Sequence, residues 1–470
     1  MKKVRRSRQG PFIIVLGDIL LIPLSYIAAF YIRFGDLREF KGKIPLLFLF
    51  LMVLIYIIVF YFFDHYEPRK KYFSWMSLFE ISFSVFVAGV LTSFLKYTFF
   101  LFPIGRGIFV IASLILAVSS FLWRTACYQL FHFFIKPKMA VIVGTGKPAC
   151  DLAVLISSTA SDFELAGLIE DQAARTCGNE TARPEKVLGT SDELLEILGK
   201  NKIGLIILSS PVENDASLIK QLIEARLRGI EVTDLPEMVQ FLKGKIPIDH
   251  VPEAWFLESR KLGLSEKHVL AKIKRLTDIA FSSFFLALSL PLWPLIALAI
   301  KINSRGPVIY KQKRIGKNET VFSLYKFRSM VDKAEKDGAV WADENDTRIT
   351  VVGKILRNLH LDELPQLVNV LKGEMSLVGP RPERPEFVQE LKRSIPYYSF
   401  RHIMKPGLTG WAQINFPYAS SMEESHEKLE YDLYYISRGN WLLDIRIILK
   451  TAKASVFGKE QKKSVKKNES

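Results

Sequence analysis

Hydrophobic residues form long runs with few charges near the N-terminus. Two of the runs carry no charged side chain and two carry one each, and together they cover residues 11–32, 44–63, 81–102 and 107–123. The single charges are Asp18 and Lys96. A helix needs about 20 predominantly apolar residues to cross the hydrocarbon core of a bilayer. The pattern therefore predicts a membrane protein with a four-helix transmembrane bundle within residues 1–135.

The distribution of basic residues between these runs predicts their orientation. With the N-terminus inside, the segments on the inner side hold eleven Lys and Arg residues and those on the outer side hold six. Cytoplasmic loops carry the excess of basic residues in membrane proteins. We therefore expect the N-terminus and the chain beyond the fourth helix to lie in the cytosol.

A fifth uncharged run, residues 279–300, contains Pro291 and Pro294 near its middle. Proline lacks the amide hydrogen that a helix interior requires, and it breaks or kinks the helix. Basic residues flank the run on both sides, which favours the same membrane face for both ends. The pattern predicts a re-entrant membrane helix that bends at the two prolines, with a kinked spanning helix as the alternative.

Residues 136–250 alternate short β-branched runs with helical patterns, which is typical of a Rossmann-like parallel sheet. Strands are expected at residues 139–143, 165–169, 203–208 and 230–232, and a helix at 149–157. The turn Gly144-Thr145-Gly146 between the first strand and the helix has the position of a phosphate-binding loop, but it lacks the third glycine of the dinucleotide motif. A nucleotide site and a structural or regulatory module both remain open. A linker is expected at residues 251–271.

Composition and charge limit the kinds of chemistry expected for the C-terminal part of the chain. The chain has 470 residues, with 64 Lys and Arg against 48 Asp and Glu, and a formal charge of +16. Three cysteines and seven histidines, without the spacing of metal ligands, give no support to zinc chemistry or a disulfide framework. The basic residues that follow the re-entrant segment lie next to the bilayer, so an anionic substrate or lipid fits them better than nucleic acid.

Two short motifs carry candidate catalytic residues. Asp362 and Glu363 follow a helical pattern at residues 353–359, and adjacent residues on a helical turn point about 100° apart. One carboxylate could therefore attack an electrophile while the other holds a cation, although Asp362 could instead cap the next helix. In Gly379-Pro380-Arg381-Pro382-Glu383, the prolines restrict the backbone and favour bidentate contact between Arg381 and a phosphate. The glycine-rich loop 405–415, with Trp411, suggests sugar or base recognition.

These residues, taken together, resemble the bacterial sugar transferases, the monotopic polyprenyl-phosphate phosphoglycosyltransferases. The resemblance covers residues 272–458, and residues 459–470 form a basic tail. It rests on Lys274-Arg275 with Asp278, the apolar run, and residues 325–330, 361–367, 379–383 and 406–415. The four apolar runs and the Rossmann-like segment resemble the long-chain members of that family. The implied fold is α plus α/β, ending in a re-entrant helix and a mainly helical catalytic domain on the cytosolic face of the bacterial inner membrane.

The resemblance also implies an activity. A UDP-sugar would donate a sugar-1-phosphate to undecaprenyl phosphate or a similar polyprenyl phosphate, releasing UMP, as the first membrane step of exopolysaccharide, capsule or O-antigen synthesis. Asp362 would be the nucleophile of a covalent aspartyl-phosphosugar intermediate, and Asp362 and Glu363 would bind Mg²⁺. The implied phosphate-binding positions are Lys326, Arg328, Arg357 and Arg381, with Asp432 as a late acidic site residue. The sugar, the acceptor length and a homodimer are left open.

Two other functions compete with this interpretation. A membrane-anchored nucleotide-sugar oxidoreductase or dehydratase would use the turn at Gly144, but residues 139–270 contain no Tyr-x-x-x-Lys pair. A non-enzymatic scaffold of a polysaccharide assembly complex would use Asp362 only as a helix cap. The alternatives predict different contacts for the Asp362 side chain, so these contacts discriminate between them.

Overall fold

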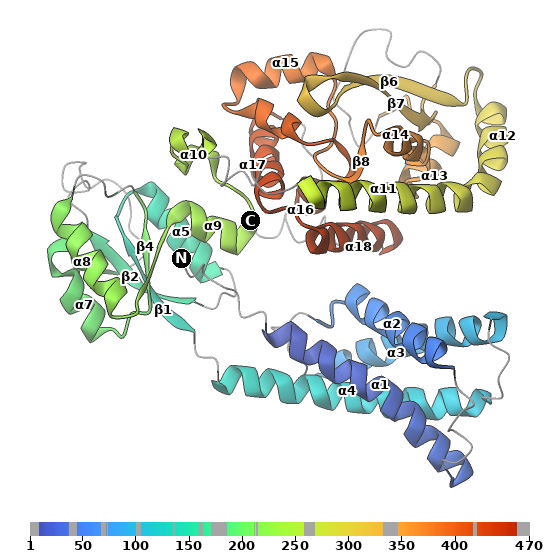
Figure 1. The fold of residues 1–470 in the computed structure, drawn as a ribbon, viewed down its shortest axis with the longest axis horizontal. Coiled ribbons are helices and arrows are strands. Elements are labelled where there is room, and N and C mark those ends of the chain that lie inside the picture. Colours follow the sequence, from blue (N-terminus) through green and yellow to red (C-terminus); the bar gives the residue numbers. More distant parts are fainter. Residues whose placement is uncertain are drawn as a thin grey trace. The chain divides into compact units, whose positions relative to one another are not determined.

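The computed structural model describes most of the chain, and it divides into two compact units, Met1–Leu242 and Lys243–Ser470. The described residues are 9–36, 45–66, 72, 74–99, 105–134, 137–158, 163–170, 186–210, 212, 215–257, 268–331, 346–416 and 421–457. The fold of each unit is shown in Figure 1.

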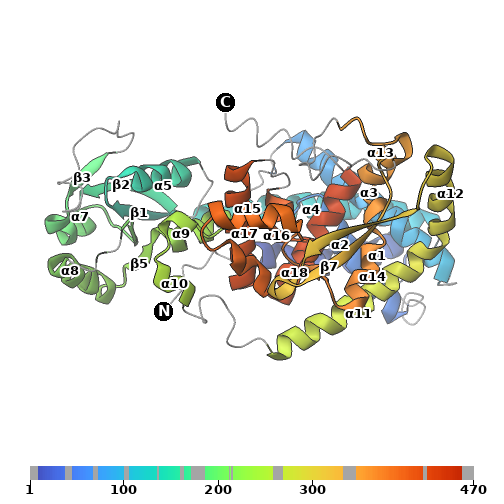
Figure 2. The same cartoon turned by 90° about the horizontal axis from the view of Figure 1, so that it is seen from above.

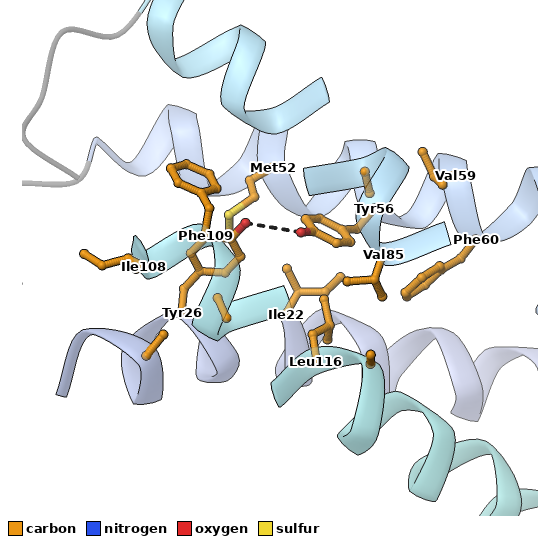
Figure 3. Close-up of a cluster of buried hydrophobic side chains, with 14 of the residues drawn as sticks. Ile22, Tyr26, Met52, Tyr56, Val59, Phe60, Val85, Ile108, Phe109 and Leu116 are labelled. Atoms are coloured by element: carbon orange, nitrogen blue, oxygen red, sulfur yellow. Dashed lines mark hydrogen bonds between the residues drawn. The ribbon is translucent and has the colours of Figure 1, made fainter. Parts of the chain in front are cut away.

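Four apolar helices begin the first unit, as the hydrophobic runs predict. They are α1 (Gln9–Phe34), α2 (Leu46–Phe62), α3 (Trp75–Phe99) and α4 (Arg106–Phe134). Three of them are long and apolar enough to cross a membrane, whereas α2 has 17 residues and is shorter. Figure 3 shows the packed interior of these helices, where the hydroxyls of Tyr26 and Tyr56 lie 3.2 Å apart. The outward faces keep large hydrophobic side chains exposed, such as Phe12 and Phe86, as expected for a lipid-facing surface.

Asp18 is paired with Arg124, and both residues are buried, at 0% and 1% exposure. Two guanidinium nitrogens donate to the two carboxylate oxygens at 3.0 and 2.7 Å. Ser120 donates a further hydrogen bond to Asp18, and the guanidinium lies over the ring of Phe60. This geometry joins α1 to α4.

Removal of one member of this pair leaves the other as an uncompensated buried charge. We expect Asp18→Leu to lower the free energy of unfolding by about 3–5 kcal/mol. The double variant Asp18→Leu/Arg124→Leu should recover most of that loss, because it removes both charges. Unfolding by a denaturing detergent in mixed micelles measures the difference. Equal destabilisation by the single and double variants would contradict this role.

A five-stranded parallel sheet follows, in the order β3-β2-β1-β4-β5. Its strands are β1 (Lys138–Val143), β2 (Phe163–Glu170), β3 (Val187–Thr190), β4 (Leu205–Leu208) and β5 (Glu231–Asp234). Its helices are α5 (Lys147–Ser158), η1 (Ser191–Glu193), α7 (Leu194–Lys200), α8 (Ala216–Leu227) and α9 (Leu235–Lys243). The order matches the first five strands of the Rossmann order 3-2-1-4-5-6, as the prediction of a Rossmann-like parallel sheet implies, although β3 was not among the expected strands.

Alternation along β1 explains why helices cover both faces of this sheet. Ala140 and Ile142 pack with α5 and α9, whereas Val141 and Val143 pack with α7 and α8. All four side chains are buried, so the strand reads as a continuous apolar run. The turn after β1 places Gly144 at a φ of 119°, a left-handed conformation that favours glycine. A ligand for this turn remains an open question.

The second unit contains the fifth apolar run as a broken helix. It consists of α11 (His268–Ser289), the 3₁₀ turn η3 (Leu290–Leu292) and α12 (Trp293–Asn303). Figures 1 and 2 show α11 and α12 leaving the turn in different directions. At the break, Ser289 donates its hydroxyl to the Leu286 carbonyl at 3.0 Å and accepts from the Trp293 indole at 3.3 Å. The predicted break at Pro291 and Pro294 is confirmed.

The rest of this unit is mainly helical. Its strands are β6 (Ile309–Ile315), β7 (Val321–Phe327), β8 (Ser376–Val378) and β9 (Gly407–Thr409), which form an antiparallel β6–β7 pair and a parallel β8–β9 pair. Its longer helices are α13 (Val351–Asn358), α14 (Gln366–Lys372), α15 (Pro385–Ser394), α17 (Met422–Arg438) and α18 (Trp441–Phe457). Short elements are η2 (Ile248–His250), α10 (Glu253–Leu257), η4 (Lys317–Glu319), η5 (Leu361–Glu363), η6 (Tyr398–Ile403) and α16 (Trp411–Asn415).

The first residues of this unit pack into its core, although the sequence divides them between the middle domain and a linker. Ile246, Ile248, Val251 and Phe256 are buried in one cluster with α15, η6 and α17. The Ile246 and Ile248 amides also donate to Glu430 on α17. Residues 243–257 therefore belong to the second unit and not to the sheet domain or to a linker.

The polar residues at the start of α11 attach it to the rest of the unit. Arg275 donates to the carbonyls of Val370 and Leu371 at 2.6 and 2.7 Å, and so caps the C-terminus of α14. Asp278 accepts from the Leu377 amide at 3.1 Å. These contacts hold the apolar helix α11 against α14 and β8, the elements next to the candidate site.

Candidate active site

Asp362 lies in η5, between α13 and α14, and is 6% exposed. His360, two residues before Asp362, has a left-handed backbone conformation with a φ of 54°. The chain therefore turns sharply after α13. Among the described residues, no hydrogen bond or ion pair holds the Asp362 carboxylate. The next helix has Pro365 at its N-cap and no side-chain capping bond, so the capping alternative for Asp362 is wrong.

Charged groups surround Asp362. Burial raises the pKa of this carboxyl above its ordinary value, Lys326 lowers it, and the neighbouring Glu363 raises it again. Arg357 also acts to lower it. Asp362 is therefore a buried carboxylate with two cations nearby and no bonded partner among the described residues, an arrangement that leaves its oxygens available for chemistry.

Glu363 differs from Asp362 because its carboxylate forms ion pairs. Its Oε1 lies 2.9 Å from Lys326 Nζ and 3.5 Å from Arg381 Nη2. Burial alone would raise its pKa, but Lys326 and Arg381 lower the pKa of Glu363 to about 2. The two adjacent carboxylates thus differ in protonation preference, as expected for residues with different roles.

Lys326 is positioned by the strand that carries it. Asn369 on α14 is fully buried and bonds the edge of β7, accepting from the Tyr325 amide at 3.1 Å and donating to the Ser323 carbonyl at 2.7 Å. This side chain takes the place of a neighbouring strand and fixes β7 beside η5. Sequence reasoning missed Asn369, because one amide on a helix has no pattern that predicts its strand partner.

The other predicted cations separate into two groups. Arg357 on α13 donates to Ser329 at 2.9 Å and lies close enough to influence Asp362. Arg328 instead turns away toward the end of α12, where it donates to the carbonyl and hydroxyl of Ser304 at 2.7 and 2.9 Å. Arg328 is 6% exposed, so in this structure it anchors the broken helix rather than joining the cluster at Glu363.

The loop that carries Arg381 is held along its whole backbone. Each carbonyl from residue 380 to residue 383 accepts a hydrogen bond at 2.9–3.0 Å, in turn from the Gly407 amide, the Arg401 guanidinium, the Arg314 guanidinium and the Ile315 amide. A Cβ on Gly407 would lie 2.1 Å from the Gly379 amide nitrogen, so this crossing requires glycine. The Arg381 side chain therefore projects from a fixed backbone.

Asp432 lies in a separate buried network behind this loop. It pairs with Arg401 at 2.8 Å, while Glu383 accepts from Lys428 at 2.5 Å and lies 3.6 Å from Arg314. Asp432 is thus not brought to Asp362, but it supports the arginine that bonds the Arg381 carbonyl. Sequence reasoning missed Arg401 and Lys428, since they lie 20 and 45 residues from their partners in this loop and belong to no motif.

The loop 405–415 is structural, contrary to the expectation of sugar or base recognition. Trp411 is 6% exposed, packs in the core beside Tyr435, and donates its indole N–H to the Gly244 carbonyl at 2.7 Å. The loop's aromatic residue and glycines therefore serve packing between close backbones. Its composition alone does not distinguish this role from ligand binding.

The carboxylates fit a magnesium ion of modest coordination. Mg²⁺ prefers oxygen ligands and keeps several waters, so one or two protein carboxylates with substrate phosphates suffice. Asp362 and Glu363 offer such oxygens on adjacent residues. Within the described part of the chain, no three His, Cys, Asp or Glu side chains form a group that could hold a metal. A magnesium ion at this pair would therefore need water and substrate oxygens to complete its coordination.

Comparison with known proteins shows which class of protein this geometry belongs to. The sequence model of the bacterial sugar transferase family matches residues 269–458. The chain is 36% identical over 207 residues to a UDP-glucose:undecaprenyl-phosphate glucose-1-phosphate transferase of Caulobacter vibrioides, covering 44% of this chain and 78% of that protein. The chain therefore belongs to the bacterial sugar transferase family, as the resemblance predicted.

Two other relatives match longer parts of this chain. The UDP-N-acetylgalactosamine-undecaprenyl-phosphate N-acetylgalactosaminephosphotransferase of Aeromonas hydrophila is 42% identical over 233 residues, covering 49% of this chain and 54% of that protein. The undecaprenyl-phosphate glucose phosphotransferase of Komagataeibacter xylinus is 34% identical over 331 residues, covering 68% and 60%. The chain therefore spans little more than half the length of these two relatives, and their names include two different sugars.

The buried network behind Arg381 predicts sensitivity to acid. Burial would raise the pKa of Glu383, but Lys428, Arg401 and Arg314 lower it to about 2, against an ordinary value of 4.5. A depressed carboxyl pKa stabilises the fold above the unfolded pKa, and this contribution is lost as the pH falls from about 4.5 toward 2. Glu383→Gln should lower the unfolding free energy at neutral pH by roughly 2–3 kcal/mol and flatten its pH dependence in that window.

Denaturant unfolding followed by tryptophan fluorescence between pH 2 and 7 measures this effect. Glu390→Gln, an exposed site on α15, is the matched control and should retain the wild-type slope. Equal slopes for Glu383→Gln and the wild type would show that the ion pairs of Glu383 do not stabilise the fold.

Proposed function

We propose that this protein is a UDP-sugar:undecaprenyl-phosphate sugar-1-phosphate transferase that initiates polysaccharide synthesis. The observation that carries the proposal is the pair of adjacent carboxylates. Asp362 is buried with no bonded partner in the described part of the chain, while Glu363 is held by Lys326 and Arg381. Membership of the bacterial sugar transferase family and the names of the relatives support the substrates.

The proposed chemistry uses Asp362 twice. A carboxylate oxygen of Asp362 attacks the β-phosphorus of the UDP-sugar, and the bond from this phosphorus to the bridging oxygen breaks. The bond's electron pair leaves on UMP, and the sugar phosphate remains on Asp362 as an acyl phosphate. The phosphate of the lipid then attacks the same phosphorus and returns the electron pair to Asp362. Covalent catalysis of this kind divides one difficult transfer into two easier steps.

Each neighbouring residue has a role in bringing anions together. Lys326, Arg357 and Arg381 offset the repulsion between the attacking carboxylate and the phosphates, and their fixed positions avoid reorganisation during the reaction. Asp362 and Glu363 would hold Mg²⁺, which supplies charge neutralisation to the phosphate oxygens. Asp432 acts indirectly, because its ion pair holds Arg401 on the Arg381 carbonyl.

The membrane arrangement is part of the same proposal. We infer that α1 to α4 span the bacterial inner membrane, and that α11 and α12 form a re-entrant hairpin whose ends lie on the cytosolic side. The break at η3 and the basic flanks support the hairpin. α18 exposes Trp441, Leu442 and Ile445, which supports contact with the membrane surface. This arrangement brings a cytosolic donor and a membrane lipid to one site.

Replacement of the nucleophile tests the covalent route. Asp362→Asn preserves size but removes the attacking oxygen anion, so transfer of labelled phosphosugar to undecaprenyl phosphate should fall by roughly 10³-fold or more. Intact-protein mass spectrometry with donor alone should show the phosphosugar adduct on the wild type and not on the variant. Asp249→Asn, at an exposed carboxylate, is the matched control.

Near-normal transfer by Asp362→Asn would contradict the assignment of the nucleophile. Release of UDP in place of UMP would instead indicate simple glycosyl transfer. The two results are separable, because one reports on the variant and the other on the product formed by the wild type.

The pH profile of transfer tests the role of Lys326. Attack requires the ionised Asp362, and Lys326 opposes the upward pKa shift that burial causes. Lys326→Met should therefore raise the pKa of Asp362 and move the acidic limb of the kcat profile to higher pH. Lys326→Arg keeps the charge and should leave the limb near its wild-type position. Identical acidic limbs for Lys326→Met and the wild type would contradict electrostatic support of Asp362 by Lys326.

A further inference from the structure

Basic residues gather at one edge of the five-stranded sheet. All its strand pairs are parallel, so every strand begins at the same edge, which we call the start edge. Exposed cations lie at the start of a strand, or within five residues before it, for β1, β3, β4 and β5. They are Lys138, Lys186, Lys200, Lys202, Arg226 and Arg228.

Three of these cations are paired and three are not. Lys138 pairs with Glu231, Lys200 with Glu196 and Arg228 with Glu224. Within the described part of the chain, Lys186, Lys202 and Arg226 form no ion pair. Glu164, near the start of β2, is a further exposed acid at this edge. The start edge therefore keeps an excess of positive charge.

The opposite edge of the sheet, where the strands end, is acidic. Glu170 and Asp234 end β2 and β5, and Asp215 caps the start of α8. The 3₁₀ turn after β3 adds two exposed carboxylates, Asp192 and Glu193. Because the two edges carry opposite charge, the domain has one side suited to an anionic partner.

The connection to α4 determines which edge lies nearer the bilayer. α4 contains a segment, Gly107–Leu130, that is long and apolar enough to cross a membrane, and the helix ends at Phe134. β1 begins at Lys138, four residues later. Four residues span at most roughly 14 Å, so the start edge is tethered close to the end of this span.

An apolar stripe on α8 leads to the same edge. Ile219, Ile223 and Leu227 recur at every fourth residue and so share one face of the helix. Their exposure rises along the helix, from 36% to 56% and then 83%. Since α8 leads into β5, Leu227 lies at the start edge, between Arg226 and Arg228. Exposed aliphatic side chains beside cations are typical of a helix that contacts a membrane surface.

We propose that the start edge of the sheet domain docks on the cytosolic leaflet, with Leu227 among the lipid head groups and Lys202 and Arg226 facing lipid phosphates. This inference rests on the membrane arrangement given with the proposed function. Anionic lipids attract basic surfaces near the bilayer. A second copy of the chain is a poorer partner, because a symmetric contact through this edge would place the same cations against each other.

Photo-crosslinking of the full chain in lipid nanodiscs tests the docking. The photoreactive residue p-benzoylphenylalanine is placed at position 227 or, as the matched control, at position 147, an exposed lysine at the opposite edge. In nanodiscs of phosphatidylcholine with phosphatidylglycerol, position 227 should give lipid adducts at about ten times the yield of position 147, as measured by mass spectrometry. Equal yields at the two positions, or crosslinks from position 227 to a second copy, would overturn the proposal.

Removal of charge tests the role of the cations. With the photoreactive residue at position 227, Lys202→Gln/Arg226→Gln should lower the lipid yield about fivefold in nanodiscs that contain phosphatidylglycerol. Lys147→Gln/Lys220→Gln removes the same charge from exposed sites away from the start edge and should retain the wild-type yield. Equal yields for these two double variants would overturn the contact between the start edge and anionic lipid.

A charge-preserving variant separates charge from local shape. Lys202→Arg/Arg226→Lys should keep the wild-type yield of lipid adducts, and a loss as large as that of the glutamine variant would overturn the electrostatic contact. The crosslinking requires no sugar donor, so it is independent of catalysis. A wild type that forms lipid adducts at position 227 but transfers no phosphosugar would contradict the proposed transferase function and not the docking.

Discussion

The candidate site depends on an unequal division of charge between two adjacent carboxylates. Glu363 pairs with two cations, at 2.9 Å from Lys326 and 3.5 Å from Arg381, whereas Asp362 pairs with no cation that the structure describes. Burial without a bonded partner raises the pKa of Asp362, whereas the paired Glu363 has a pKa of about 2. The same cations thus hold Glu363 as a fixed anion, and Asp362 is the acid that we propose as the nucleophile. A site with both acids paired, or both free, would lack this difference.

Long-range contacts maintain that division. Lys326 lies where it does because Asn369 bonds the edge of β7, and Arg381 because four successive carbonyls of its loop are bonded. Arg275 and Asp278 connect the same elements to α11, the first limb of the broken apolar helix. The broken apolar helix and the elements that hold the carboxylates are therefore one packed unit, which suits the proposed reaction with one soluble and one membrane-bound substrate.

Buried ion pairs away from the candidate site fix the relative positions of secondary-structure elements. Asp18 and Arg124 join α1 to α4 where apolar packing alone would tolerate rotation or sliding of the helices. Arg401 and Asp432 do the same behind the Arg381 loop. In both places the opposite charge offsets part of the cost of burial, and the loss of one partner exposes that cost.

Local patterns in the sequence determined the apolar helices, the break at Pro291 and Pro294, and the parallel sheet, because length, proline chemistry and alternation act within one element. They did not indicate β3, a four-residue strand that contains a glycine. Motifs also identified Asp362, Glu363, Lys326 and Arg381, which the fold brings together. Only the tertiary structure decided that Arg328 anchors α12, that Trp411 is a core residue, and that Asn369 and Arg401 position the site. Those roles depend on which distant backbone group each side chain meets, and no local pattern carries that information.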